Sequence, residues 1–225
     1  MDEIFIARIE AGIRQFVVLG AGLDTRAYRF APRLHDVRVF EVDHPSTGAW
    51  KRERLHKALR RLPGNVAYVS VDFESHSLAE RLVSAGFDPT LSTFFLWEGV
   101  MMYLTPAAID ETLSFLSQTA PGSTLAFEYF YADVFDHPDR YYGARKLFDY
   151  VQARGEPYVF GIDPDDMDGY LAARGMRTLA HVRAHDFARM YLEQRGLWPG
   201  RRMIDFWGVV HAEIVKPFRP PVPGT

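Results

Sequence analysis

Apolar residues gather in short runs along the chain up to residue 130, and each run has the length of a β-strand. The runs are rich in β-branched and aromatic residues, which favour strands. Several are apolar at nearly every position, as is typical of parallel strands that are covered on both faces. The strands expected from this pattern are residues 15–20, 37–42, 66–71, 92–97 and 123–130.

Segments with helical periodicity separate these runs. Residues 46–62 place four apolar side chains on one stripe of a helix, namely Trp50, Leu55, Leu59 and Leu62. Another helix is expected to begin with Thr105 as its N-cap and Pro106 as its first residue. The alternation of strands and helices predicts an α/β fold, in which a doubly wound, mostly parallel sheet carries helices on both faces.

The alternation breaks at residues 131–161, which are rich in Tyr, Phe, His and Asp. The segment follows the fifth expected strand and is longer than a regular connection in such a sheet. Ligands of open α/β sheets bind outside the carboxyl ends of the strands, where this segment begins. We therefore expect residues 131–161 to form a helical cap insert that covers a ligand pocket at this edge and selects the molecule that binds there.

Regular elements return after the insert. A helix is expected over residues 163–175, with Asp163 as its N-cap, and strands are expected over 176–182 and 205–215. Residues 216–225 are too rich in proline to continue a strand, and we expect a loose tail there.

Composition narrows the class of protein. The 225 residues are enough for one well-buried domain, so we expect residues 1–225 to form a single domain. The net charge of −3 gives no general attraction to nucleic acid or to an anionic membrane. Cysteine is absent from the sequence, which excludes disulfides and thiolate chemistry. Without a visible targeting or membrane-spanning segment, we expect a cytoplasmic protein, and the oligomeric state stays open.

Two further patterns have simple structural explanations. The basic run at residues 51–61 falls on the polar face of an expected helix, so a solvated helix face explains it better than a nucleic-acid site. The eight histidines show no paired spacing of the kind that metal ligands adopt. No metal site is expected.

The candidate chemistry begins at the end of the first strand, in "VVLGAGLDTRAYRF". Gly20 and Gly22 let the backbone bend sharply there and approach a ligand closely. Glu41 and Asp43 end the second expected strand, and Asp43 lies 21 positions after Gly22. A carboxylate at that place accepts hydrogen bonds from both hydroxyls of a ribose. The pattern therefore indicates a cofactor that contains adenosine.

The turn also distinguishes between such cofactors. A dinucleotide turn needs a third glycine where this chain has Thr25, and Asp24 places a negative charge where a pyrophosphate would bind. A phosphate-binding P-loop is excluded because no Gly-Lys-Ser/Thr follows the glycines. An adenosine cofactor without phosphates remains, and S-adenosylmethionine fits this description.

Acidic residues at two more strand ends support a cofactor site. Asp72 ends the third strand beside Phe73, where the carboxylate and a backbone N–H can hold an adenine ring. Glu98 follows the fourth strand, where its carboxylate can meet the ammonium of a methionine moiety. Carboxyl ends of parallel strands share one edge of the sheet, so these groups are expected to lie together.

The acceptor side of the site is less defined. Tyr103, Glu128, Tyr129 and Tyr131 lie at or beyond strand ends, where they either shape an acceptor pocket or fill space under the insert. A hydroxyl acceptor needs a group that removes its proton, whereas a carboxylate acceptor needs none. The sequence ties no histidine to the cofactor edge, so no catalytic residue is assigned.

These stretches resemble the leucine carboxyl methyltransferase-like family of S-adenosylmethionine-dependent methyltransferases, which includes many bacterial O-methyltransferases. The resemblance rests on "LGAGLDTR", "EVDHP" and "EGVMMYL", and it covers residues 15–130 nearly continuously. It implies a seven-stranded sheet whose last strand runs antiparallel, and S-adenosylmethionine as the cofactor. It implies cofactor contacts from Gly20, Gly22, Asp43, Asp72, Phe73 and Glu98.

The resemblance favours methylation of an oxygen, in a carboxylate or a hydroxyl of a small molecule. Two alternatives stay open. The family has a helical segment before its first strand, with a basic residue that meets the cofactor carboxylate, whereas 14 residues precede Gln15 here. A member that binds the cofactor without catalysis is therefore one alternative. The other is an NAD-dependent oxidoreductase, against which Asp24 and Thr25 argue.

Overall fold

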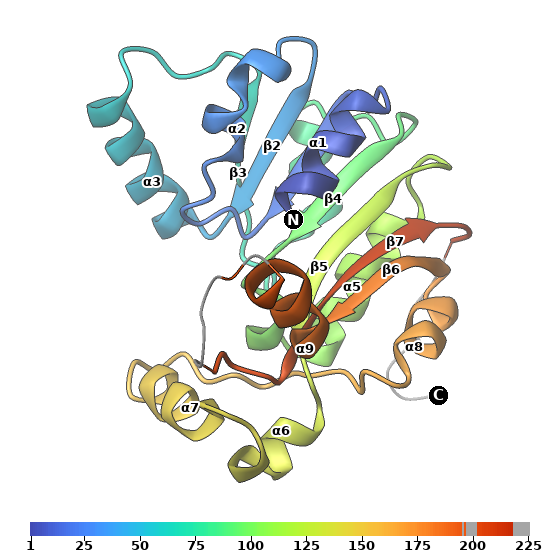
Figure 1. Cartoon of the computed structure of the whole chain (residues 1–225). Helices are drawn as coiled ribbons and strands as arrows, with labels where there is room; N and C mark the ends of the chain where they lie inside the picture. Colours follow the sequence, from blue (N-terminus) through green and yellow to red (C-terminus); the bar gives the residue numbers. More distant parts are fainter. Residues whose placement is uncertain (195, 197–201, 218–225) are drawn as a thin grey trace.

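The computed structural model describes residues 1–194, 196 and 202–217 of the chain. Its centre is a seven-stranded sheet with the strand order β3-β2-β1-β4-β5-β7-β6 (Figure 1). The strands are β1 (Gln15–Leu19), β2 (Arg38–Asp43), β3 (Val66–Ser70), β4 (Thr93–Trp97), β5 (Thr124–Phe130), β6 (Met176–Arg183) and β7 (Trp207–Ile214). Strands β1 to β5 pair in parallel, and β7 runs antiparallel to both β5 and β6. The expected doubly wound sheet with an antiparallel last strand is confirmed.

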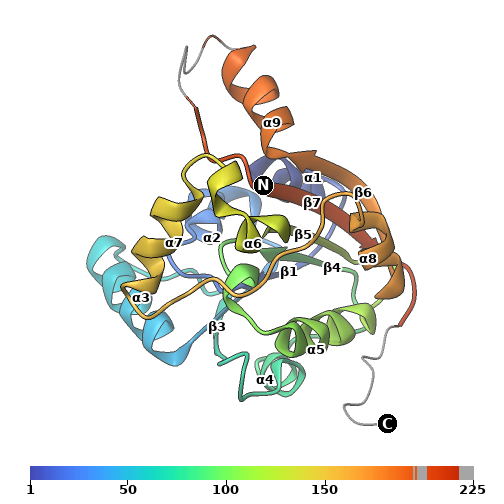
Figure 2. The same cartoon turned by 90° about the horizontal axis from the view of Figure 1, so that it is seen from below.

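Helices cover both faces of this sheet, as Figure 2 shows. They are α1 (Asp2–Glu10), α2 (Arg26–Arg29), α3 (Pro45–Ala58), α4 (Leu78–Ser84), α5 (Pro106–Ser117), α6 (Asp133–Asp136), α7 (Ala144–Gln152), α8 (Met167–Ala173) and α9 (Ala184–Phe187). Short 3₁₀ turns occupy Ala31–Arg33, Met101–Tyr103 and Pro138–Arg140, and Ala188–Glu193 forms a π-helical turn. In the part of the chain that the structure describes, no helix is long and apolar enough to cross a membrane.

The central strands are buried on both faces because successive side chains point to opposite sides. On β4, Phe95 and Trp97 join the larger core cluster, which also holds apolar residues of α4, α5 and α8. Phe94 and Leu96 face the other way and pack in the cluster that includes Phe5 of α1. All four β4 side chains are fully buried, which explains the continuous apolar run seen in the sequence.

The helix over the end of β2 differs from the expected one. α3 ends at Ala58, four residues before the predicted end, and Trp50 of the predicted apolar stripe is 41% exposed. The neighbouring Lys51 is instead 4% exposed. Its ammonium lies 2.9 Å from the carboxylate of Glu41, which is buried in β2. An ion pair rather than an apolar stripe therefore ties this helix to the sheet.

Two predicted N-caps have different outcomes. Thr105 caps α5 as expected, because its hydroxyl accepts a hydrogen bond from the backbone N–H of Ala108. The predicted helix at 163–175 is shorter and begins at Met167, so Asp163 is not its cap. The Asp163 carboxylate accepts the N–H of Asp165 instead and forms a turn before the helix.

The segment 131–161 carries α6, α7 and a connection that returns toward the sheet. Tyr131 and Ile162 form a parallel bridge at its two ends. Val134 and Ala144 are fully buried in the larger core cluster. The segment is therefore integrated into the core of the protein. Most of the predicted tail, residues 218–225, lies outside the described residues.

Candidate active site

The glycine turn after β1 is held in place by packing and by hydrogen bonds. Gly20 and Gly22 have φ angles of +66° and +38°, which side chains rarely adopt. A Cβ atom on Gly20 would overlap a methyl group of Val100. A Cβ atom on Gly22 would meet only the carbonyl oxygen of Gly20, at 3.8 Å. Gly20 is therefore required by packing, and Gly22 leaves an open surface beside the turn.

The second strand fixes the same turn. The N–H of Ala21 donates to the carbonyl of Val42 at 2.8 Å, and the N–H of Gly22 donates to Asp43 Oδ2 at 2.5 Å. Asp43 Oδ1 accepts the N–H of His44 at 2.7 Å. Two backbone donors thus orient the Asp43 carboxylate, whose oxygens still have lone pairs for further donors.

A buried polar network lies beneath the turn. Besides its ion pair with Glu41, Lys51 donates to the carbonyl of Ala21 at 3.3 Å. The hydroxyl of Tyr28 donates to Glu41 Oε2 at 2.9 Å and lies 3.0 Å from the hydroxyl of Tyr68. Glu41 therefore supports the turn from inside the protein and is not available to a ligand, although it precedes Asp43 by only two positions in the sequence.

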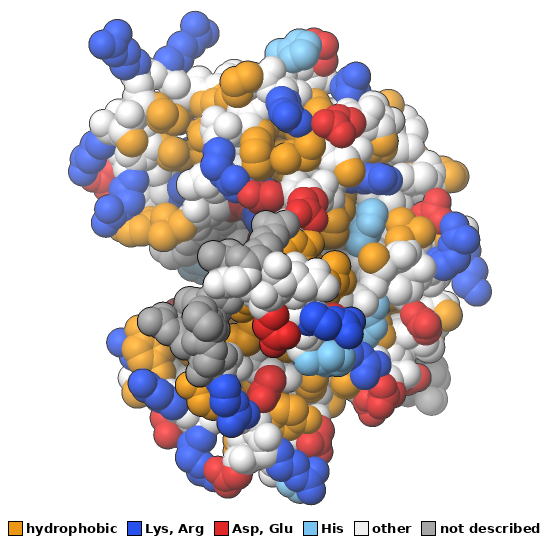
Figure 3. Space-filling model, viewed as in Figure 1, with side chains coloured by type: hydrophobic (Ala, Val, Ile, Leu, Met, Phe, Trp, Pro, Cys, Tyr) orange, Lys and Arg blue, Asp and Glu red, His pale blue; other side chains and the backbone are white. Residues whose placement is uncertain are grey.

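A cavity of about 640 Å³ opens at the carboxyl edge of the sheet, on one side of the turn. The space-filling view is hollowed on this face between the parts that hold α3 and α7 (Figure 3). Several residues predicted for the cofactor or acceptor line this cavity, namely Gly20, Gly22, Asp43, Asp72, Phe73 and Tyr103.

A second cavity of about 400 Å³ lies on the other side of the turn, lined by Asp24, Arg26 and Glu98 among others. Gly20, Gly22 and Gly99 line both cavities. The two cavities therefore form one groove around the turn, and we call it the edge groove. All six predicted cofactor residues line this groove.

Arg26 is the residue of the edge groove that sequence reasoning missed. Its guanidinium forms ion pairs with Asp2 at 2.7 Å, with Asp24, and with Glu98 at 2.8 Å. The Arg26 side chain is 12% exposed. The signal was present in "LGAGLDTR", where a basic residue directly follows the turn. Glu98, expected to meet an ammonium, is thus already paired with a cation inside the groove.

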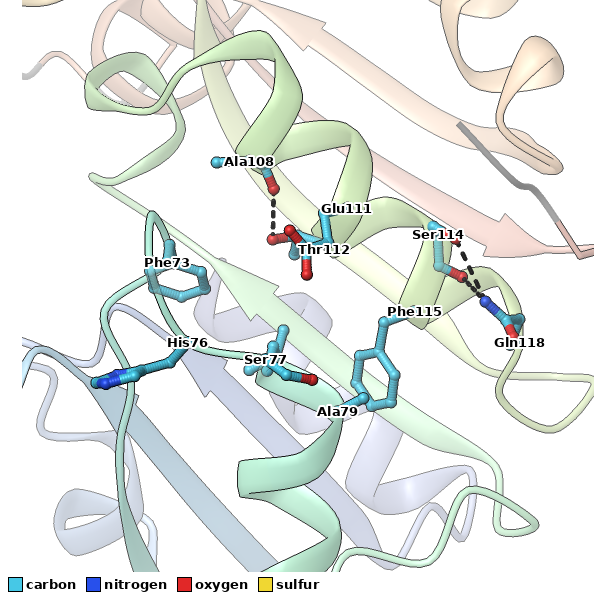
Figure 4. Close-up of a pocket in the computed structure, with 11 residues that line it drawn as sticks. Phe73, His76, Ser77, Ala79, Ala108, Glu111, Thr112, Ser114, Phe115 and Gln118 are labelled. Atoms are coloured by element: carbon cyan, nitrogen blue, oxygen red, sulfur yellow. Dashed lines mark hydrogen bonds between the residues drawn. The ribbon is translucent and has the colours of Figure 1, made fainter. Parts of the chain in front are cut away.

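The part of the site that is predicted for adenine is fixed by hydrogen bonds and by ring stacking. The Asp72 carboxylate accepts the N–H of Glu74 and the hydroxyl of Ser75, and these bonds lower its pKa. The ring of Phe73 stacks on buried Trp97 at 6.3 Å between centroids. Phe73 also lines a separate cavity of about 220 Å³ between α4 and α5, drawn in Figure 4. Phe73 therefore separates the edge groove from this smaller cavity.

The four residues suggested for the acceptor pocket do not lie together. Tyr103 lines the edge groove, and its hydroxyl lies 3.4 Å from that of Tyr158. Glu128 is close to Gly99, whose N–H donates to its carboxylate. Tyr129 is fully buried, with its hydroxyl 2.7 Å from His181 Nε2.

Tyr131 is also buried, and its hydroxyl accepts the N–H of Ala184. The structure thus places Tyr129 and Tyr131 in the core beneath β6 and α9, away from the edge groove. The reason is the alternation of side chains along β5, which turns Tyr129 away from the face that Glu128 occupies.

The return connection of the 131–161 segment reaches the edge groove. Gly155, Glu156, Pro157 and Val159 line the larger cavity. The N–H of Val159 donates to the carbonyl of Met102 at 2.8 Å, which anchors the connection beside the 3₁₀ turn that holds Tyr103. Among the described residues, no group of three or more His, Cys, Asp or Glu side chains is arranged to hold a metal ion.

The sequence and the fold match a known class of enzymes. The model of the leucine carboxyl methyltransferase family matches residues 1–117, more than half of the chain. The chain therefore belongs to this family, as expected from its motifs, and the family is one of S-adenosylmethionine-dependent methyltransferases.

Particular relatives agree with this assignment. The Bacillus subtilis protein named "Putative S-adenosyl-L-methionine-dependent methyltransferase YktD" is 30% identical over 195 residues, covering 86% of this chain and 64% of that protein. A Mycolicibacterium smegmatis protein with the same kind of name is 36% identical over 185 residues, covering 79% of this chain and 60% of its own length. The chain thus spans less than two thirds of these relatives.

A solved structure supports the fold. An O-methyltransferase family protein from Burkholderia thailandensis superimposes with a TM-score of 0.59 at 12% identity, covering 92% of this chain and 53% of that chain. The superposition covers almost the whole of this chain, so the two proteins share their fold.

Proposed function

We propose that this chain catalyses S-adenosylmethionine-dependent methyl transfer to an oxygen atom of a small-molecule acceptor. One observation carries the proposal. The ends of β2, β3 and β4 bring Asp43, Asp72 and Glu98 into a single groove around the glycine turn that follows β1. The net charge of −3 gives no general attraction to nucleic acid, which agrees with a small-molecule acceptor, and the absence of cysteine is compatible with the cytoplasm.

The residues of the edge groove fit the cofactor part by part. Asp43 is oriented by two backbone N–H groups and can accept both ribose hydroxyls. Asp72 and Phe73 flank the place where an adenine would bind. Arg26 and Glu98 form an ion pair at the far end, which matches the carboxylate and ammonium of an amino acid in charge.

The groove does not suit a dinucleotide. The Asp24 carboxylate accepts the backbone N–H of Arg26 at 2.6 Å and so occupies the start of α2. A pyrophosphate would need that N–H and would meet the negative charge of Asp24. This contact supports a cofactor without phosphates over the NAD alternative.

The bound cofactor supplies a methyl group on a positively charged sulfur. The chain's own task is to orient the two reactants and to exclude water, since an in-line displacement depends mainly on positioning. The glycines common to both cavities are where the adenosine part and the amino-acid part would join. Gly20, Gly22 and Gly99 are therefore the residues that we place nearest the reacting atoms.

Calorimetry with S-adenosylhomocysteine tests the cofactor assignment. We expect Asp43→Ala to weaken binding by roughly 10- to 100-fold, because a hydrogen bond to a charged group contributes about 1.5–3 kcal/mol. Asp36→Ala is the matched control, since Asp36 is exposed and precedes β2 at the opposite edge of the sheet. Equal affinities of both variants would remove Asp43 from the site.

Two further measurements separate the alternatives. S-adenosylhomocysteine should raise the melting temperature and NADH should not, because only a ligand of the folded state stabilises it. Turnover with a labelled methyl donor and a panel of small acids and phenols then tests catalysis. Cofactor binding without any methyl transfer would identify a non-catalytic member of the family.

A further inference from the structure

Glu128 lies on β5 beside the acid that ends β4. In the parallel register of these strands Trp97 pairs with Phe127, so Glu98 and Glu128 follow side by side at the carboxyl edge. Glu128 is partly buried, whereas its neighbours Phe127 and Tyr129 are fully buried on the opposite face. The protein thus holds two adjacent carboxyl groups where the edge groove begins.

The Glu128 carboxyl lies against the backbone of that groove at Gly99. The N–H of Gly99 donates a hydrogen bond to it, and a Cβ atom on Gly99 would lie 3.8 Å from Glu128 Oε1. Gly99 lines both cavities of the edge groove. Glu128 is therefore next to the residues where the two parts of the cofactor would join.

The two neighbouring acids have different environments. Arg26 pairs with Glu98 at 2.8 Å. For Glu128, burial and then the charge of Glu98 raise the pKa to about 7, against the opposing Gly99 hydrogen bond. The charge of Glu128 also contributes to a raised pKa of Tyr158, whose hydroxyl contacts that of Tyr103. Glu98 is thus the charged side chain that acts on the Glu128 pKa, and Tyr158 is its titratable neighbour.

We propose that Glu128 is the proton acceptor for a phenolic hydroxyl, and that the acceptor of this enzyme is a neutral phenol. The proposal rests on the proposed methyl transfer. As the phenol oxygen bonds to the methyl carbon, its proton passes to a Glu128 carboxylate oxygen. The carbon–sulfur electron pair goes to sulfur, which leaves a neutral thioether, and Glu128 returns the proton to water after the product leaves.

The chemistry of the site favours a phenol over other oxygen acceptors. A carboxylate acceptor would bring a further negative charge beside Glu128 and would need no base. A phenol ionises near pH 10, only about three units above a base that titrates near neutrality. An aliphatic alcohol is a much weaker acid and is out of reach of such a base. The ring of Tyr103, which lines the groove and packs against Tyr158, offers an aromatic surface for a phenol ring.

Direct titration of Glu128 tests the first half of the proposal without turnover. Carbon-13 NMR of the full chain, labelled at glutamate carboxyls, assigns the Glu128 signal as the one lost in Glu128→Gln. A midpoint between about pH 6 and 8 in the protein loaded with S-adenosylhomocysteine supports a base that works at neutral pH. A midpoint near the ordinary glutamate value of 4.5 overturns the proposal.

Acceptor preference tests the second half. Small phenols and the benzoic acids of the same substitution are offered with a labelled methyl donor. We expect methyl transfer to phenols only, and a kcat about 10²- to 10⁴-fold lower in Glu128→Gln, the usual contribution of a general base. Glu80→Gln, an exposed acid on α4, should match the unmodified protein. Methylation of the benzoic acids, or of none of the phenols, overturns the proposal.

Cofactor affinity separates this proposal from the proposed function. Glu128→Gln should bind S-adenosylhomocysteine as the unmodified protein does, because the carboxyl serves the acceptor. If the unmodified protein does not bind S-adenosylhomocysteine, the proposed function fails. The other outcome is that the unmodified protein binds S-adenosylhomocysteine and transfers methyl groups, while Glu128→Gln has the same kcat and pH profile as the unmodified protein. In that case only the proposed role of Glu128 fails.

Discussion

The edge groove is built differently on its two sides. The ends of β1 to β4 form the side proposed for the cofactor, which we call the cofactor side, and there backbone groups orient a carboxylate, as in the bond from Gly22 N–H to Asp43. The end of β5 and residues 131–161 form the side proposed for the acceptor, which we call the acceptor side, and there side chains distant in sequence meet, as Tyr103 and Tyr158 do. The cofactor side thus rests on short connections between neighbouring strands, and the acceptor side rests on long-range packing.

This difference suggests a division of roles. A site fixed by backbone bonds between paired strands holds one ligand in one geometry. A site formed by side chains and a long connection changes shape when a few residues change, as functional loops commonly do. We therefore expect mutations on the cofactor side to cost affinity or stability, and mutations on the acceptor side to alter acceptor use at smaller cost.

The largest loss of stability is expected from a change in the buried ion pair beneath the cofactor side. Lys51→Met leaves the buried Glu41 without its cation, which costs about 3–5 kcal/mol of unfolding free energy. Loss of the bond to the Ala21 carbonyl should also weaken S-adenosylhomocysteine binding. Urea unfolding and calorimetry measure the two effects.

Lys57 offers a matched control for this change. It pairs with Glu53 on the same helix, but both side chains are largely exposed, so Lys57→Met should cost less than about 0.5 kcal/mol. Adding Glu41→Gln to Lys51→Met should restore part of the loss by removing the buried charge. Equal unfolding free energies for Lys51→Met and Lys57→Met would show that the buried pair does not hold the cofactor side.

The next largest loss of stability is expected at the glycine turn, where Gly20 and Gly22 should differ in what their substitution costs. Gly20→Val should lose about 2–4 kcal/mol of stability, because overpacking against Val100 adds to the cost of a left-handed φ. Gly22→Val should lose less stability, since its Cβ meets only a carbonyl oxygen. It should nevertheless abolish S-adenosylhomocysteine binding, because the side chain enters the groove. Normal binding by Gly22→Val would reduce the turn to a structural bend.

The sequence predicted the cofactor side better than the acceptor side for a physical reason. Strand runs, the glycine turn and acids at strand ends are local patterns, and the parallel sheet then brings the ends together. Strand order alone is enough to place Asp43, Asp72 and Glu98 at one edge of the sheet. The alternation of side chains along β5 also carried information, since Glu128 and Tyr129 cannot face the same side.

What the sequence did not reveal depends on distant partners. Lys51 lies in a basic run that has the pattern of a solvated helix face, and only the burial of Glu41 makes it a core residue. Tyr158 reaches Tyr103 because the connection after α7 hydrogen-bonds to Met102 through Val159. No periodic pattern in the chain encodes such a return.

A pH-dependent effect is expected at Glu128, where the two sides meet. Its pKa of about 7 in the folded protein exceeds the ordinary value of 4.5, mainly because the carboxyl is buried. The folded state therefore binds this proton more tightly, and the resulting stability is present below pH 4.5 and lost as the pH rises to 7. Glu128→Gln should remove this loss, so its stability relative to the unmodified protein should rise by about 1–3 kcal/mol between pH 4 and pH 8.

Urea unfolding across this pH range measures the difference, with Glu80→Gln as the exposed control. The effect belongs to folding and needs neither cofactor nor acceptor. A constant difference between Glu128→Gln and the unmodified protein from pH 4 to pH 8 would contradict an elevated pKa at this position.

The smallest effect is expected at the connection that lines the groove from the 131–161 segment. Replacing the whole segment would remove Val134 and Ala144 from the core, so the change is confined to Glu156→Ser together with Pro157→Gly. Both residues are exposed, so the loss of stability should come mainly from the freer unfolded backbone at position 157 and stay at about 1 kcal/mol. The affinity for S-adenosylhomocysteine should change by no more than about twofold, because this connection lies on the acceptor side. Pro157→Gly also removes the contact that the proline ring would make with the acceptor. Such a contact contributes about 1 kcal/mol through apolar burial, so its loss should raise the KM of the acceptor about fivefold. Pro89→Gly, in the exposed loop before β4, should change neither constant. A larger loss of cofactor affinity than of acceptor affinity would place this connection on the cofactor side and end the division of roles between the two sides of the groove.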